Sequence, residues 1–165
     1  MKKSMTTTTI SQEWMDRFWA KVNKNAPKGC WEWTSYKTWN GYGAMWMLGK
    51  LRKTHRISYE LAFGEIPQGM QIDHICSNRS CLNPDHLRIA TPAENMRHKL
   101  RQKNNSSGFK GIYLDKGLGK WRALIMVNKK RYHLGHFSTP ELAHAAYCNA
   151  AVRLHGDFAS SGVAK

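Results

Sequence analysis

Four side chains with soft donor atoms are spaced as zinc ligands usually are. Cys76, Cys81 and His86 follow one another in one segment, with four residues between each pair. Cys30 offers a fourth ligand, because Cys148 lies in an alanine-rich stretch and fits a small core residue. Three thiolates and one imidazole complete a tetrahedral Zn²⁺ shell with no open position, which is typical of a structural site. The alternative is a Cys76–Cys81 disulfide or ordinary buried thiols.

A second group carries ligands of a different kind. His74 can accept a proton from water near neutral pH, which phosphodiester hydrolysis requires. Asp73 and Asn95 supply a carboxylate and an amide oxygen, the donors that suit Mg²⁺. Neighbouring residues of a strand point to opposite faces, so Asp73 and His74 serve one site only if the strand ends or twists there. Alone, an Asp-His pair would fit a solvated loop.

The segment around these residues has a clear order of elements. Residues 72–75 and 87–90 have the composition of strands. Residues 91–94 (Thr-Pro-Ala-Glu) form a capping box with proline at the first helical position, which marks the start of a helix. The segment is therefore predicted as strand, loop, strand and helix, with Asn95 in the first helical turn.

The rest of the chain predicts an α+β protein. Ser11 caps a helix, and a polar stretch at 101–107 has the composition of a linker. The remaining expectations are a loose leader at 1–10, short strands and turns at 30–55, a helix at 57–63, strands at 110–114, 120–127 and 131–137, and a helix at 138–156.

The charge of the chain limits its partners. Lys and Arg number 26 against 11 Asp and Glu, which gives a formal net charge of +15. Such a chain suits a polyanion, although ribosome-associated and membrane-surface proteins share this property. No apolar run approaches the roughly 20 residues that cross a membrane, and no secretory signal is visible. We expect an intracellular protein, not secreted, with no membrane partner, in a reducing compartment where cysteines favour metal.

Residues 29–100 resemble the HNH (His-Me finger) endonucleases through Asp73-His74, Asn83 and Asn95. The zinc spacing is similar to that of the His-Cys-box homing endonucleases, whose catalytic histidine also lies two residues before the first cysteine of the loop. The resemblance implies a ββα-metal nuclease domain in which His74 is the general base and Asn83 braces the loop. It makes Asp73 and Asn95 the Mg²⁺ ligands, although His-Cys-box enzymes generally use only the asparagine.

Two basic side chains near this motif are further candidates. Arg56 fits either a contact to the scissile phosphate or a plain surface residue. His98 lies one turn beyond Asn95 and can point at the same site, but a surface or phosphate-contacting role is the expected one.

Residues 108–158 resemble the APETALA-type or ethylene-response-factor DNA-binding domain. The resemblance rests on the stretches 108–113, 119–121, 134–137 and 139–156. It implies a three-stranded antiparallel sheet packed on one helix, with the sheet face in the DNA major groove. Tyr113, Asp115 and His133 depart from that family's Arg, Arg and Trp, so base specificity does not transfer. The candidate DNA contacts are Lys110, Tyr113, Lys120, Trp121, Arg122, Arg131 and His133.

Strand alternation limits this set, because Lys120 and Arg122 share one face of a strand and Trp121 lies on the other. Trp121 is therefore also a candidate core residue. A small basic domain that binds RNA or protein is the alternative for this half.

Together these observations predict a nuclease domain at 1–100, a linker at 101–107 and a DNA-binding domain at 108–165. The predicted function is Mg²⁺-dependent, site-directed cleavage of double-stranded DNA by a homing endonuclease with one structural Zn²⁺. A homodimer is expected if both strands are cut. The alternatives are a non-catalytic DNA-binding regulator that keeps the nuclease half as a zinc scaffold, and an RNA-binding protein.

Overall fold

The computed structural model describes residues 10–101 and 105–163, and the chain forms two compact units. The first comprises Met1–Gly64 and Asn78–His86, and the second comprises Glu65–Ser77 and Leu87–Lys165. Residues 1–9 of the expected leader and 102–104 of the expected linker lie outside the described residues. The domain boundaries expected from the sequence stay predictions.

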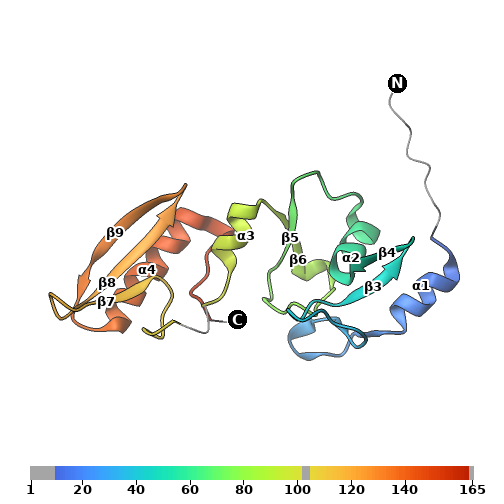
Figure 1. Ribbon diagram of the computed structural model, residues 1–165, viewed down its shortest axis with the longest axis horizontal. Helices are drawn as coiled ribbons and strands as arrows, with labels where there is room; N and C mark the ends of the chain where they lie inside the picture. The colour runs from blue at the N-terminus through green and yellow to red at the C-terminus, as the bar shows by residue number, and fades with distance from the viewer. Residues whose placement is uncertain (1–9, 102–104, 164–165) are drawn as a thin grey trace, which may run out of the picture. The chain divides into compact units, whose positions relative to one another are not determined.

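The first unit is organised around aromatic side chains. Its first helix begins after Ser11, whose hydroxyl accepts a hydrogen bond from the Trp14 amide at 3.3 Å. The core consists of Phe18, Trp33, Met47, Ile57 and Leu82. The elements are α1 (Gln12–Trp19), β1 (Val22–Asn23), η1 (Pro27–Gly29), β2 (Glu32–Trp33), β3 (Ala44–Met47), β4 (Lys50–Lys53), α2 (Thr54–Phe63) and η2 (Pro84–His86) (Figure 1).

Gly43 lies where the core of this unit is tightly packed. A Cβ at Gly43 would lie 2.4 Å from the Thr54 hydroxyl and 2.7 Å from the Trp33 ring. No side chain fits there, so glycine lets the chain pass against Trp33 just before β3. Helix α2 begins at Thr54, three residues before the start expected from the sequence.

The second unit begins with the strand–strand–helix segment. Strands β5 (Gln71–His74) and β6 (Leu87–Ala90) are antiparallel, and Asp73 lies opposite Arg88. Helix α3 (Pro92–His98) follows with the expected capping box, in which Thr91 accepts from the Glu94 amide and the Glu94 carboxylate accepts from the Thr91 amide. The order of elements from 71 to 98 is therefore as the sequence predicts.

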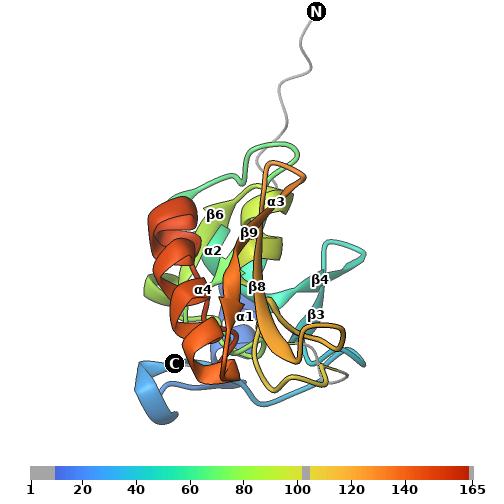
Figure 2. The same cartoon turned by 90° about the vertical axis from the view of Figure 1, so that its left-hand side faces the viewer.

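A three-stranded antiparallel sheet and one helix complete this unit. The strands are β7 (Ile112–Asp115), β8 (Lys120–Val127) and β9 (Lys130–Phe137), in that order. Helix α4 (Pro140–His155) lies along one face of the sheet, as both views show, and η3 (Gly156–Phe158) follows it (Figures 1 and 2). The core between them consists of Ile112, Ala123, Ile125, Ala143, Tyr147, Ala150 and Ala151. The mixed α/β character predicted from the sequence is confirmed.

In the part of the chain that the structure describes, no helix is long and apolar enough to cross a bilayer.

Candidate metal centre and active site

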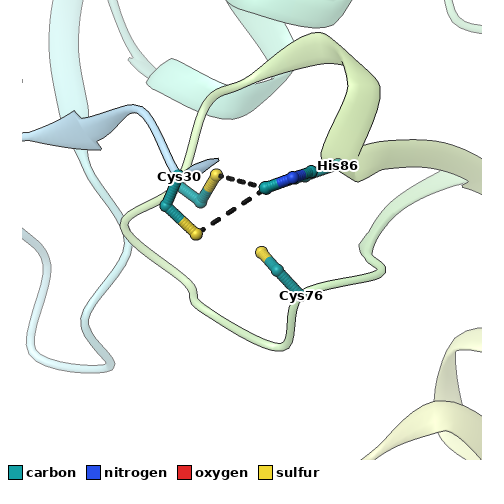
Figure 3. Close-up of side chains that lie close together, drawn as sticks. Cys30, Cys76 and His86 are labelled. Carbon is teal, nitrogen blue, oxygen red and sulfur yellow. Dashed lines mark hydrogen bonds between the residues drawn. The ribbon is translucent and has the colours of Figure 1, made fainter. Parts of the chain in front are cut away.

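The four predicted zinc ligands lie together. The ligand atoms of Cys30, Cys76, Cys81 and His86 are all within 4.8 Å of one another (Figure 3). The sulfurs of Cys30 and Cys81 each lie 3.6 Å from His86 Nδ1. None of the four cysteines of the chain forms a disulfide. The structure thus brings together the set that the sequence selected.

The distances within this cluster fit a tetrahedral zinc ion. Zn–S bonds of about 2.3 Å and Zn–N bonds of about 2.0 Å place neighbouring ligand atoms about 3.5–3.8 Å apart. The 3.6 Å separations from His86 Nδ1 to the sulfurs of Cys30 and Cys81 fall in this range. Cys30 and Cys81 are buried, so solvent has little access to two of the ligands. The donor set and its spacing can hold Zn²⁺ in a closed, structural site.

Asn83 connects the ligand-bearing segments through the backbone. Its Nδ2 donates to the Gly29 carbonyl at 2.8 Å, next to Cys30, and its Oδ1 accepts from the Asp85 amide at 3.1 Å. The His86 amide in turn donates to the Asn83 carbonyl at 2.9 Å. Asn83 itself is 8 % exposed. These contacts are those of the loop-bracing role that the resemblance implies, and that role stays a proposal.

Asp73 lies at the centre of a buried charge network. Its Oδ1 is 2.9 Å from His98 Nδ1, and its Oδ2 accepts from Arg88 Nε at 2.9 Å. The Asp73 side chain is 5 % exposed. Burial by itself raises the pKa of this carboxyl, but the hydrogen bonds and charges of His98 and Arg88 outweigh it, so the pKa is lowered from its usual value. Asp73 is therefore held as a carboxylate.

This network bears on the proposed Mg²⁺ site. A carboxylate oxygen has two lone pairs, so Asp73 retains acceptor capacity beyond its contacts to His98 and Arg88. Asn95 donates from Nδ2 to Gln71 Oε1 at 2.5 Å, and no described residue donates to its Oδ1. The oxygens of Asp73 and Asn95 are thus chemically suited to a hard divalent cation.

His74 occupies the last position of β5 and is 6 % exposed. A turn begins at once, because the Ser77 amide donates to the His74 carbonyl at 2.8 Å. The strand therefore ends directly after the Asp73-His74 pair. Arg56 is half-buried in the first turns of α2.

Most of the expected DNA contacts share one face of the β7–β8–β9 sheet. Tyr113 pairs with Arg122, and Arg122 pairs with His136, so these residues form a row across the three strands. Lys120, Arg131 and His133 are exposed on the same strands. A hollow of about 250 Å³ on this surface is lined by Tyr113, Arg122, Leu124, Ile125, Met126 and Arg131.

Two members of the expected DNA-binding set have other contacts. Trp121 packs against the core under α4, on the opposite side of β8 from Arg122. Lys110 donates from Nζ to the carbonyls of Arg97 and Lys99, at 2.6 and 2.7 Å. Burial lowers the pKa of Lys110 to about 8. Lys110 therefore binds the C-terminal carbonyls of α3, and neither Lys110 nor Trp121 is kept among the DNA contacts proposed below.

Sequence reasoning missed two partners of the candidate active site, Arg88 and Gln71, and favoured a surface position for a third, His98. Residue spacing is a signal for two of these three residues. His98 lies three residues after Asn95, on the same face of a helix, and Gln71 lies two residues before Asp73, on the same face of a strand. His98 was expected at the surface, but it is 7 % exposed and bonded to Asp73. Arg88 could not be found, because the pairing register of β5 and β6 is not fixed by a short turn.

Comparison with known proteins bears on this site. Residues 52–97, which include β5, β6 and α3 up to its penultimate residue, match the family model described as HNH endonuclease. The chain is 34% identical over 110 residues to Protein 3.8 of Escherichia phage T7, which covers 67% of this chain and 90% of that protein. This chain carries an HNH endonuclease domain.

Other relatives of this HNH chain are also viral. It is 31% identical over 122 residues to an uncharacterised HNH endonuclease of Acanthamoeba polyphaga mimivirus, covering 73% of this chain and 62% of that protein. It is 38% identical over 79 residues to Protein 7.7 of Escherichia phage T7, covering 48% of this chain. The matched part of the chain covers only 61% of the length of Protein 7.7. No solved structure matches the chain significantly.

Proposed function

We propose that this HNH chain is a divalent-metal-dependent endonuclease that hydrolyses phosphodiester bonds of double-stranded DNA. The observation that carries the proposal is the placement of the family residues within the matched segment. His74 and Asp73 end β5, and α3 is bonded to that strand through His98–Asp73 and Asn95–Gln71. The general base and both oxygen ligands therefore come from two elements that are fixed to each other.

In the proposed mechanism His74 accepts a proton from water as the water oxygen attacks phosphorus. The bond from phosphorus to the 3′ oxygen breaks, this oxygen takes up a proton from solvent, and the products carry 5′-phosphate and 3′-hydroxyl ends. Asp73 and Asn95 would hold Mg²⁺, which supplies stabilisation of the charge that develops on the leaving oxygen. Arg88 and His98 position the Asp73 carboxylate, and Arg56 is a candidate contact to the scissile phosphate.

The proposed role of Cys30, Cys76, Cys81 and His86 is structural. Zinc binding at such a site supplies on the order of 10 kcal/mol, which is enough to fold a loop that has little apolar surface. Thiolate ligands persist in a reducing compartment, so we place the protein inside the cell.

We further propose that the outer face of the β7–β8–β9 sheet holds the duplex, as in the APETALA-type domains. Support comes from the sheet with one helix on its inner face and from the cations exposed on its outer face. The proposed DNA contacts are Tyr113, Lys120, Arg122, Arg131 and His133. A site-directed, homing role is consistent with relatives that occur in phages. A homodimer would cut both strands, because one active site cuts one strand at a time.

His74→Ala tests the nuclease assignment. We expect the variant to keep zinc and DNA binding but to lose Mg²⁺-dependent cleavage of a supercoiled plasmid. His155→Ala is the matched control, since it removes a histidine from the end of α4. Cleavage retained by His74→Ala would reject His74 as the base. If the wild-type chain binds DNA but does not cut it, the alternative function, a non-catalytic DNA-binding regulator, would be favoured.

A further inference from the structure

A tight turn in the first unit presents one tryptophan almost completely to solvent. The Gly41 amide donates to the Thr38 carbonyl at 2.8 Å, which closes a four-residue turn with Trp39 at its second position. The Trp39 side chain is 97 % exposed. It therefore contributes nothing to the core, although tryptophan has the largest apolar surface of any side chain.

The turn is held rigidly by its own polar groups. The Thr38 amide donates to the Tyr42 carbonyl at 2.8 Å, and the Tyr42 amide donates to the Thr38 hydroxyl at 3.2 Å. Arg79, from a distant part of the chain, donates to the Asn40 carbonyl at 3.0 Å. The backbone of such a braced turn loses little conformational entropy when the turn binds a partner.

Positive charge surrounds the base of the turn. The Lys53 ammonium lies 4.6 Å from the Tyr42 ring centroid, and the Arg79 guanidinium lies 5.6 Å from the same centroid. An apolar partner would gain nothing from these cations, whereas phosphates would gain ion pairs with them. A flat aromatic ring flanked by cations fits a nucleic-acid strand, in which bases offer stacking faces and phosphates offer charge.

We propose that Trp39 inserts into bound DNA and stacks on a base that it unstacks from the duplex, while Lys53 and Arg79 contact the adjoining phosphates. Apolar side chains that enter between base steps kink or open a duplex in this way. The inference rests on the proposed function, because it takes DNA as the substrate. It adds a contact that none of the nuclease residues provides.

The test uses the full, zinc-loaded chain with His74→Ala and without Mg²⁺, so that binding is measured apart from cleavage. The probes are a mixed-sequence duplex with a 2-aminopurine base and the same duplex with a mismatch beside that base. Trp39→Ala should weaken binding to the paired duplex by roughly tenfold, which corresponds to the loss of one stacked base. It should also abolish the rise in 2-aminopurine fluorescence. Trp39→Phe should retain part of both effects.

Trp46→Ala is the matched control, since Trp46 is also exposed, at 66 %, but lies in β3. It should leave affinity and fluorescence unchanged, and both variants should melt at the wild-type temperature. Unchanged affinity and fluorescence in Trp39→Ala would overturn the inference, as would a loss confined to single-stranded DNA. Cleavage by the His74-containing chain is scored separately, so a chain that binds through Trp39 without cutting would reject only the nuclease.

Discussion

Asp73 has a structural task as well as its proposed catalytic one. Its carboxylate joins β5 to Arg88 of β6 and to His98 of α3, with a side chain that is 5 % exposed. Breaking a buried ion pair by removing one partner leaves the other charge uncompensated. The same residue therefore supports the geometry of the site and supplies one of its ligands.

Asp73→Asn should lower the free energy of unfolding by about 3 kcal/mol, because Arg88 and His98 would face a neutral amide. Urea denaturation at neutral pH measures the change. Asp85→Asn is the control, since Asp85 is exposed and its side chain forms no ion pair among the described residues. A loss no larger than that of Asp85→Asn would show that the network contributes little to stability.

Helix α3 depends on partners at both of its ends. Thr91 and Glu94 bond reciprocally at its start, and Lys110 binds the carbonyls of Arg97 and Lys99 at its end. Helix termini leave backbone groups without intrahelical partners, so a helix of seven residues needs these contacts. The contacts at the two ends of α3 together fix the position of Asn95 on this helix.

Thr91→Ala should cost about 1 kcal/mol of stability through the loss of the N-cap bond. It should also reduce cleavage, because Asn95 lies on the helix that this bond begins. Thr139→Ala removes the corresponding cap of α4, whose hydroxyl accepts from the Leu142 amide. It should cost a similar amount of stability and leave the cleavage rate at saturating DNA unchanged. Equal loss of cleavage in both variants would contradict a specific role for α3.

Lys110 makes stability depend on pH. Its pKa is about 8 in the folded protein and 10.5 in the absence of burial. Between these values the unfolded chain binds the extra proton, so the stability of the wild type relative to Lys110→Met should rise with pH from 8 to 10.5. Below pH 8 both states carry the charge and the difference should be flat. Thermal melts of both proteins across this range provide the measurement, and a falling difference would reject the assignment.

On the scale of the whole molecule, a bound zinc ion is expected to raise the stability of the fold, and the outer sheet face is expected to strengthen DNA binding. Metal analysis of the purified chain should find about one zinc per molecule, and a chelator should lower the melting temperature sharply because binding energy is folding energy. Cys76→Ser should reproduce that loss, whereas Cys148→Ser should not, since Cys148 lies in α4 and is not one of the four cluster residues. If the zinc-free protein were as stable as the zinc-loaded protein, the proposed structural role of zinc would be wrong.

Salt dependence tests the proposed DNA surface. Replacing Arg122 or Arg131 by alanine should weaken DNA binding and reduce the slope of log Kd against log salt by about one per residue. Arg153→Ala is the control, because Arg153 is exposed on α4, which covers the other face of the sheet. Equal effects of all three substitutions would indicate charge alone and not a DNA-binding face.

Several of these features could be predicted from the sequence, and the reasons are local. The spacing of Cys76, Cys81 and His86 and the capping box at Thr91 are short-range patterns, so they predicted the cluster and the start of α3. Lys110 could not be placed in this way, since its bonds to α3 depend on tertiary packing. Only the resemblance to the APETALA-type domain pointed from Lys110 to DNA.

The contacts that β6 and the residues after α3 make with the C-terminal half also limit how such a protein can be recombined. Arg88 donates to the Asp157 carbonyl at 2.8 Å and its guanidinium stacks on Phe158, while the Arg101 amide donates to the Gly162 carbonyl. A chimaera joined within the polar stretch 101–107 would discard these partners together with the β7–β8–β9 sheet and α4. Grafting a new recognition module therefore requires residues equivalent to Lys110, Asp157 and Phe158, or redesign of the surface that they cover.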